Sequence, residues 1–440
     1  MRILHYFLGV YRSGGLNRYA ADLAATQVRS GHTVFALYPG GSIFPGKRAA
    51  IKKRCVFSGI ECFELLHGKI IPLLEGIRDP GMILENDHNL DKKNTVDFCN
   101  AVAPDVVHIH TWMGFPEELI PCLKARGCRI VFSAHDYFGI CPRVNLIRTD
   151  GSLCPAPTDE ACSDCNASAP SYRQMQLRSI SFLLRSKKYL NVMRRLIRHS
   201  SPSGTCSRTR PVLNYTALRE HYHVLLKMCD KIHFNSEVTR SIYQRYFPDL
   251  EGIIQPVTHL GLFDRRRDKK IDQACIRLGF IGSSAPYKGL PLLKSVLKDL
   301  KKEGTANWHL DVWGSNLTGQ DQEICEIVYH GTFRAGEEET VYRDMDLLIA
   351  PSICFETFGF AVAEALSFGV PVLCSATVGA QNIVPPEMVF RGERELKEKL
   401  AVLLRDEKML SELRARIIVK KSRVPSCEEH WETLRKELYT

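Results

Sequence analysis

Short apolar runs alternate with longer amphipathic stretches along most of the chain. This alternation extends from residue 2 to about residue 134 and starts again at residue 276. It predicts two sets of parallel strands joined by helical crossovers. Between them, the segment 264–273 (DRRRDKKIDQ) is charged apart from Ile271 and predicts a solvated linker. Since 440 residues exceed what one core usually supports, we expect two Rossmann-like, doubly wound α/β domains.

The most informative stretch is LLIAPSICFETFGFAVAEALSFGVPV, residues 347–372. Its pattern predicts a buried strand over 347–350, a helix over about 359–367 and a further strand after Pro371. The loop amides around Phe358 to Phe360 would direct the positive end of the helix dipole at a ligand above the strand. A diphosphate would suit that position.

Two acidic residues flank this anion site, Glu356 in the loop and Glu364 in the helix. Such a pair is usually solvated, but the small and apolar residues around Glu364 predict a buried helix, in which a carboxylate needs a partner. The two hydroxyls of a ribose would supply one for Glu364. Glu356 would face the group attached to the phosphate. The pattern indicates a sugar nucleotide.

The segment resembles the donor site of the retaining family-4, group 1 glycosyltransferases, which have the GT-B fold of two Rossmann-like domains facing across a cleft. The resemblance also covers MRILHYFLGVYRSGGLNRYAADLAATQVRSGHTV, APDVVHIH, RIVFSAHDY, CDKIHFNSEVTRSIYQ, RLGFIGSSAPYKGLPLL and VYHGTFRAGEEETVYRDMDLLIAPS. Residues 141–228 and the C-terminal tail match loosely.

The resemblance implies roles for individual residues. Catalytic roles fall to Glu356, His135 and Lys288. One position departs from the family, because Ser283 stands where an arginine is usual. Lys288 would then provide most of the side-chain neutralisation of the leaving diphosphate, and Arg334 is a candidate to replace the missing arginine. The implied donor-binding residues are Gly14, Gly15, Ser283, Lys288, Phe333, Thr357, Phe358, Gly359, Phe360 and Glu364.

The resemblance also implies that the two domains bind different substrates. Residues 1–263 would form the acceptor-side domain, with a cysteine-rich and basic helical insertion at about 138–228, and residues 276–424 the nucleotide-sugar-binding domain. Residues 425–440 begin with a capping box, Ser426 and Glu429, and predict a helix that could cross back to the first domain.

The implied activity is a hexosyltransferase-type reaction. A sugar would pass with retention from a nucleotide-diphosphate sugar to a glycan or lipid-linked acceptor in polysaccharide or glycoconjugate biosynthesis. No catalytic cofactor is expected, because the D-x-D motif at Asp344 and Asp346 is interpreted as a solvent-facing helix cap. Two alternatives stay open: a GT-B nucleotide-sugar epimerase or hydrolase, and a catalytically silent membrane-associated scaffold.

Four cysteines, Cys141, Cys154, Cys162 and Cys165, lie in a loop with little apolar content. Four thiolates could hold a structural zinc that replaces the missing core. The sequence weighs this equally against free thiols. A four-thiolate shell is closed, so it would have no catalytic role.

Positive charge is concentrated in one region. Thirteen Lys and Arg oppose two acids between residues 171 and 231, whereas the whole chain carries +10. An amphipathic basic helix there could bind an anionic membrane surface, although a packed helix with a solvated basic face is slightly favoured. No nucleic-acid partner is expected, because no recognised binding module accompanies the charge. With no apolar run of about 18 residues, we expect a cytoplasmic protein, peripheral on the membrane if that helix binds it.

Overall fold

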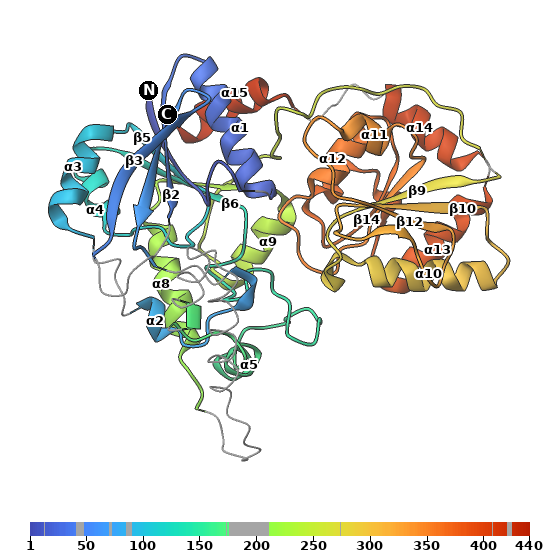
Figure 1. Ribbon diagram of the computed structural model, residues 1–440, viewed down its shortest axis with the longest axis horizontal. Helices are drawn as coiled ribbons and strands as arrows, with labels where there is room; N and C mark the ends of the chain where they lie inside the picture. The colour runs from blue at the N-terminus through green and yellow to red at the C-terminus, as the bar shows by residue number, and fades with distance from the viewer. Residues whose placement is uncertain are drawn as a thin grey trace, which may run out of the picture.

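The computed structural model describes residues 1–12, 14–40, 48–69, 73–84, 90–172, 174–175, 211–272, 274–406, 408–419 and 425–440. Two α/β domains lie side by side, the first blue to green and the second yellow to red (Figure 1). The two sets of strands predicted from the apolar pattern are present, one in each domain.

The first domain is built on a sheet whose described strands follow the order β3-β4-β2-β1-β5-β6-β7-β8. Neighbours pair in parallel except β3 and β4. The strands are β1 (Arg2–Tyr6), β2 (Thr33–Pro39), β3 (Ala50–Phe57), β4 (Ile60–Leu66), β5 (Val106–Ile109), β6 (Arg129–Ala134), β7 (Lys231–Phe234) and β8 (Ile253–Ile254).

The expectation of unbroken strand–helix alternation is wrong at one edge of this sheet. β3 and β4 form an antiparallel hairpin. Its turn is Ser58-Gly59, and both residues have positive φ, 50° and 82°. Two consecutive residues with positive φ are typical of the tight turns that match the strand twist of a hairpin. The adjacent apolar runs therefore pair directly, without an intervening helix.

Helices cover both faces of the first sheet. α3 and α4 lie together on one side, and α1 lies on the other (Figure 1). The basic helix expected around residues 177–198 lies outside the described residues. The described helices of this domain are α1 (Gly15–Arg29), η1 (Leu73–Glu75), α2 (Gly81–Leu84), α3 (Lys92–Val102), α4 (Leu119–Lys124), α5 (Asp159–Cys165), α8 (Tyr215–Lys227) and α9 (Glu237–Tyr246).

The second domain has the sheet order β11-β12-β10-β9-β13-β14-β15, in which only β11 is antiparallel to its neighbour. The predicted strand–helix–strand unit is confirmed as β13, α12 and β14. The strands are β9 (Ile276–Ile281), β10 (Trp308–Trp313), β11 (Thr318–Gln320), β12 (Ile327–Gly331), β13 (Leu347–Ala350), β14 (Val372–Ser375) and β15 (Val389–Phe390).

Figure 1 shows α10 and α13 on one face of this sheet, with α11 and α12 on the other. Apolar faces of α10 and α13 enclose the core against the strands. The helices are η2 (Pro286–Lys288), α10 (Leu290–Lys302), α11 (Glu338–Tyr342), α12 (Phe360–Ser367), η3 (Gly379–Ile383), η4 (Pro386–Met388), α13 (Gly392–Arg405), α14 (Met409–Val419) and α15 (Cys427–Leu438).

α15 follows the second domain in sequence but packs on α1 of the first domain (Figure 1). Its N-terminus has the capping box of Ser426 and Glu429. Trp431 and Leu434 of this helix join an apolar cluster that also contains Tyr19 of α1 and Val362 of α12. One apolar core therefore extends across both domains and fixes their contact.

Two sequence expectations in the second domain need correction. The described part of the linker, residues 264–272, is only partly solvated, because Lys269 Nζ lies 2.6 Å from Asp346 Oδ1 and Ile271 is buried. Asp346 is 2 % exposed and also accepts a hydrogen bond from the Arg277 amide, so it does not face solvent as expected for the D-x-D motif. Within the described residues, none of the helices is long and apolar enough to cross a bilayer.

Candidate functional site

A cleft of about 440 Å³ lies between the domains, where strands of both sheets end. The first domain contributes the N-terminus of α1 and the residues that follow β6 and β7. The second contributes η2 and the loop between β13 and α12. In open parallel sheets, ligands bind beyond the carboxyl ends of the strands, so this cleft is the candidate active site.

The loop before α12 leaves backbone donors unpaired. Gly359 has φ of 101° and caps the helix, and a Cβ there would meet Val378 at 2.7 Å, so only glycine fits. Among the described residues, none accepts a hydrogen bond from the amides of Phe358, Gly359 or Phe360. These amides and the positive end of the α12 dipole form an anion-binding position of the kind predicted from sequence.

Beside this position, Lys288 and Glu356 form an ion pair, with Lys288 Nζ 3.0 Å from Glu356 Oε1. Burial lowers the pKa of Lys288, but the Glu356 carboxylate more than reverses this, so the pKa lies above its ordinary value. Burial raises the pKa of Glu356, yet the Lys288 charge and a hydrogen bond from Ser352 leave it lowered. Both groups are therefore charged at neutral pH.

Lys288 is the only lysine or arginine among the described residues that line the cleft. Arg334, the candidate substitute for the family's usual arginine, is exposed and does not line it. Ser283 lies exposed after β9 and is also outside the lining. Lys288 is thus the one positively charged side chain of the described cleft lining.

The second-domain loop is fastened to the first domain at Thr357. Its hydroxyl donates to the His135 carbonyl oxygen at 3.2 Å. Its own carbonyl oxygen accepts from the hydroxyls of Ser236, at 2.8 Å, and Thr239, at 2.9 Å. These bonds hold the anion-binding loop against the C-terminal edge of the first sheet.

His135 and Asp136 follow β6 and form the first-domain wall of the cleft. Burial, and then the neighbouring His233 and His430, hold the pKa of His135 well below its ordinary value. Burial raises the pKa of Asp136 to about 6, against hydrogen bonds from the Phe138 amide and the Thr111 hydroxyl. The wall therefore presents a neutral imidazole beside a carboxyl group that titrates near neutrality.

Glu364 is buried behind the cleft and already has protein partners. Its carboxylate accepts from Arg18 at 3.2 Å and from the Tyr342 hydroxyl at 2.7 Å, and His259 Nε2 lies 2.9 Å away. Arg18 also binds Glu338 at 3.0 Å, which ties α1 to α11 and α12. Burial raises the pKa of Glu364, but these partners leave it lowered. A ribose would have to replace one of them.

The structure brings most of the predicted donor-site residues together. One group does not line the cleft: Gly14, Ser283, Phe333 and Glu364. Phe333 instead contacts Trp313, at 6.2 Å between ring centroids, and Gly14 precedes α1 with φ of 112°. The residues that do line it are Gly15, His135, Lys288, Glu356, Thr357, Phe358, Gly359 and Phe360.

Sequence reasoning missed several residues at this site. Asn235 and Asp136 line the cleft, and Arg18 and His259 hold Glu364. Asn235 and Asp136 directly follow predicted strands, and that position was the available signal. Arg18 and His259 are far from Glu364 in sequence, and no local pattern marks them.

The four cysteines lie in one region of the insertion, but they do not form a compact ligand set in this conformation. Cys141 and Cys162 are buried, which raises their pKa to about 12 and about 11, and Arg219 Nη1 donates to Cys162 Sγ at 3.7 Å. Among the described residues, only His5, His108 and His110 place three potential ligand atoms within 4.8 Å of one another. A structural zinc would require the thiols to move together.

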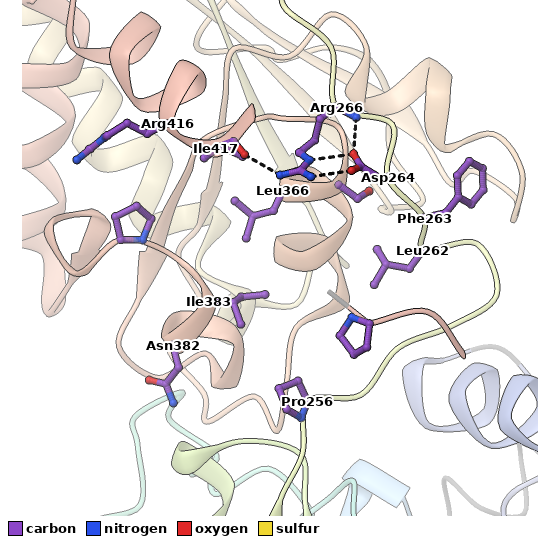
Figure 2. Close-up of a pocket in the computed structure, with 13 residues that line it drawn as sticks. Pro256, Leu262, Phe263, Asp264, Arg266, Leu366, Asn382, Ile383, Arg416 and Ile417 are labelled. Atoms are coloured by element: carbon purple, nitrogen blue, oxygen red, sulfur yellow. Dashed lines mark hydrogen bonds and ion pairs between the residues drawn. The ribbon is translucent and has the colours of Figure 1, made fainter. Parts of the chain in front are cut away.

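A second cavity, of about 380 Å³, lies between the segment that joins the domains and the second domain (Figure 2). Its lining is mainly apolar, with Leu262, Leu366 and Ile383 around it. The Arg266 guanidinium donates hydrogen bonds to Asp264 and to the Ile417 carbonyl oxygen, as the dashed lines in Figure 2 show. The cleft, with its unpaired amides and lysine, is the better anion site.

The two domains and the cleft between them have the GT-B fold. Three similar solved structures show the fold: Anabaena HepE in complex with UDP and glucose (12% identity, TM-score 0.56, 100% of each chain covered), an E. coli trehalose-6-phosphate protein bound with UDP-2-fluoro glucose (11%, 0.57, 100% of this chain and 99% of that), and the catalytic domain of Arabidopsis thaliana starch synthase IV bound to ADP and acarbose (13%, 0.54, 99% and 98%).

The family follows from two further matches. Residues 13–150 match the model of Glycosyltransferase Family 4, and residues 275–406 match that of Glycosyl transferases group 1. The chain therefore belongs to the group 1, family 4 glycosyltransferases, and the resemblance noted in the sequence is confirmed. A comparison with curated protein sequences finds no match.

Proposed function

We propose that this glycosyltransferase transfers a hexose, with retention of anomeric configuration and without a catalytic metal, from a nucleotide-diphosphate sugar to a glycan or lipid-linked glycan. The observation that supports this most is the Lys288–Glu356 pair beside the unpaired amides at the start of α12. A cation and oriented amides suit a diphosphate, and a carboxylate beside them suits sugar hydroxyls.

In this proposal the donor diphosphate lies on the amides of Phe358 to Phe360 and draws Lys288 toward its oxygens. Charge that develops on the diphosphate as the glycosidic bond breaks is stabilised by these preorganised donors. Glu356, released from Lys288, accepts hydroxyls of the sugar. The acceptor hydroxyl attacks from the same face, and its proton passes to the leaving diphosphate.

Two structural features support the proposal. Asp136, which follows β6, lines the cleft from the first domain, and this supports placing the acceptor on that side. Contacts through Thr357 keep the two domains together and limit water, which would otherwise hydrolyse the donor. The proposal places the enzyme in polysaccharide or glycoconjugate biosynthesis in the cytoplasm, at the membrane face if the basic segment binds anionic lipid.

The test is a thermal-shift screen with nucleoside diphosphates and their sugars, followed by mass spectrometry of the products. The similar structures contain UDP, UDP-2-fluoro glucose and ADP, so UDP and ADP sugars are the first probes. Stabilisation by a donor is expected by mass action. Free sugar or an epimer formed without acceptor would support the hydrolase or epimerase alternative, and binding of vesicles without donor binding would support the scaffold.

A further inference from the structure

Five histidines of the first domain form a hydrogen-bonded chain that ends at the cleft. They come from strands or strand ends that are neighbours in the sheet. Four of them have no exposed surface, and the fifth, His135, lines the cleft. The chain consists of His233, His108, His5, His110 and His135, linked through Ser133, Tyr439, Gln27 and, at the cleft, Asn235.

The direction of every bond follows from the inner end. His233 Nε2 lies 2.7 Å from the carbonyl oxygen of Gln255, which can only accept, so this nitrogen carries the proton. A neutral imidazole then accepts at Nδ1, here from the Ser133 hydroxyl at 2.7 Å. Because Ser133 donates its one hydroxyl hydrogen to His233, its oxygen accepts a hydrogen bond from His108 Nε2 at 2.7 Å.

The same logic carries through the centre of the chain. His108 Nδ1 must accept, and its donor is the Tyr439 hydroxyl at 2.6 Å, just after α15. Tyr439 in turn accepts from the Gln27 amide nitrogen at 3.3 Å. The carbonyl oxygen of Gln27 therefore accepts from His5 Nε2, at 2.6 Å.

At the cleft end of the chain, the same rules determine the orientation of the Asn235 amide. His5 Nδ1 accepts from His110 Nε2 at 2.9 Å, and His110 Nδ1 accepts from His135 Nε2 at 3.2 Å. His135 Nδ1 then accepts from the Asn235 amide nitrogen at 3.0 Å. The assignment requires neutral rings, and burial lowers the pKa of His5 and His233 to about 4.

The hydrogen-bond chain determines which polar atoms of His135 and Asn235 are free at the cleft. Both ring nitrogens of His135 are hydrogen-bonded to protein groups. The amide nitrogen of Asn235 donates to His135, and its Oδ1 has no hydrogen-bond partner among the described residues although the residue is only 1 % exposed. A buried acceptor without a partner is costly, and a ligand hydroxyl in the cleft would remove that cost.

A metal site at His5, His108 and His110 is the competing interpretation, because their ligand atoms lie within 4.8 Å. However, all six ring nitrogens of these residues already have hydrogen-bond partners. A metal would have to break three of those bonds, and three neutral imidazoles would leave its charge uncompensated in a buried site. The hydrogen-bond chain therefore accounts better for the cluster.

We propose that Asn235 binds the donor sugar, with Oδ1 accepting a hydrogen bond from a sugar hydroxyl, and that His135, His110 and His5 are positioning residues that hold its amide in this orientation. The inference rests on the proposed function, since it needs a nucleotide sugar in the cleft. It assigns the sugar contact of the first-domain wall to the amide oxygen of Asn235.

Calorimetry with UDP-glucose and UDP, or with the pair from the screen that binds the parent protein, tests the contact. Asn235→Ala should weaken binding of the nucleotide sugar about five- to tenfold, the effect of one hydrogen bond, and leave the nucleoside diphosphate unchanged. If Asn235→Ala binds both as the parent does, the inference is wrong. If the parent binds no nucleotide sugar of the panel, the proposed function itself fails.

The positioning role is tested at Tyr439, far from the cleft. Tyr439→Phe removes the hydroxyl that sets the direction of the outer half, so Gln27 can rotate and Asn235 can turn its nitrogen outward. We expect about two- to fivefold weaker binding of the nucleotide sugar alone. Tyr215→Phe is the matched control, because it also loses a buried hydroxyl, which donates to the Ile77 carbonyl oxygen at 2.7 Å outside the chain.

Nitrogen-15 NMR of labelled histidines gives a readout that loss of stability would not mimic. In the parent, the five histidines should be neutral with the proton on Nε2, and Tyr439→Phe should shift His5, His110 and His135 toward the Nδ1–H form. Tyr215→Phe should leave the spectrum unchanged. A parent spectrum with the proton of His135 on Nδ1, or one unaltered by Tyr439→Phe, would overturn the positioning role.

Discussion

Lys288 Nζ and Glu356 Oε1 lie 3.0 Å apart in the cleft, so the cation expected to hold the diphosphate is paired with the carboxylate expected to hold the sugar. The pair keeps both groups charged in a partly buried site and holds them beside the amides of α12. Donor binding would exchange this one contact for two, from Lys288 to phosphate and from Glu356 to sugar. The two side chains are therefore coupled.

The first prediction concerns Lys288. Lys288→Ala should lower turnover about a hundredfold to a thousandfold, because it removes the one lysine or arginine that lines the described part of the cleft. Lys288→Arg should recover only part, since a planar fork does not reproduce the compact ammonium. Initial rates of transfer at saturating donor give the measurement.

Lys298→Ala is the control for this variant, because Lys298 lies on α10 with an exposed side chain paired to Glu323. It should transfer sugar at the parent rate. A folded Lys288→Ala protein with a rate within a few-fold of the parent would show that another group neutralises the diphosphate.

The second prediction concerns Glu364. Glu364→Ala should weaken binding of a nucleoside diphosphate, because the ribose loses a charged acceptor worth about 1.5 to 3 kcal/mol. It should also lower the melting temperature, since Arg18, Tyr342 and His259 lose their shared partner. Calorimetry and thermal unfolding measure the two effects separately.

Glu338→Ala separates the ribose contact from the domain contact. Glu338 is buried and also binds Arg18, so this variant should lose stability without losing nucleotide affinity. Equal loss of affinity in both variants would mean that the Arg18 contacts, and not a ribose, explain the effect at Glu364.

The third prediction is the pH dependence of stability. Burial lowers the pKa of His5 and His233 from 6.5 to about 4 and that of His430 to about 3. Below pH 6.5 the unfolded chain therefore binds protons that the folded chain does not bind, and stability is lost as the pH falls. Each such histidine should lower the free energy of unfolding by about 1.4 kcal/mol per pH unit between pH 6 and 4.

Urea unfolding at a series of pH values measures this slope. Because His5 accounts for about one of these protons, His5→Gln should lower the slope of the unfolding free energy against pH by about 1.4 kcal/mol per pH unit. A free energy of unfolding that is constant from pH 7 to pH 5 would contradict the neutral, buried cluster.

The fourth prediction concerns metals. Sugar transfer should survive exhaustive EDTA treatment, because the proposed charge stabilisation uses Lys288 and backbone amides. Loss of activity with the fold intact, restored by magnesium or manganese, would contradict the metal-independent mechanism. Elemental analysis tests the structural zinc separately: about one zinc per chain, lost in Cys162→Ser, would support it, and absence of zinc would leave the four thiols free.

The sequence predicted the second-domain half of the site well because its signals are local. The strand, loop and helix from Leu347 to Ser367 follow one another directly, so Glu356 and the amides around Gly359 could be placed from periodicity and punctuation. For the D-x-D motif the prediction of a solvent-facing position holds for Asp344, which is exposed, but was wrong for Asp346. Asp346 is buried and pairs with Lys269, which lies 77 residues earlier and has no local signal in the sequence.

The first-domain half could be predicted only in part. The positions of His135 and Asn235 after β6 and β7 follow from strand order, but their hydrogen bond joins residues 100 apart. Two of the three partners of Glu364, Arg18 on α1 and His259 after β8, are distant in sequence, and Arg18 lies 346 residues away. Such contacts depend on how the domains meet, which periodicity does not describe.

Hydrogen–deuterium exchange with a bound nucleoside diphosphate tests the central claim most directly. The account predicts slower exchange at the amides of Phe358, Gly359 and Phe360 and in η2 around Lys288, with Lys288→Ala abolishing the effect at the same ligand concentration. Protection confined to the second cavity, around Leu366 and Ile383, or no protection at saturating ligand, would contradict the assignment of this cleft as the donor site.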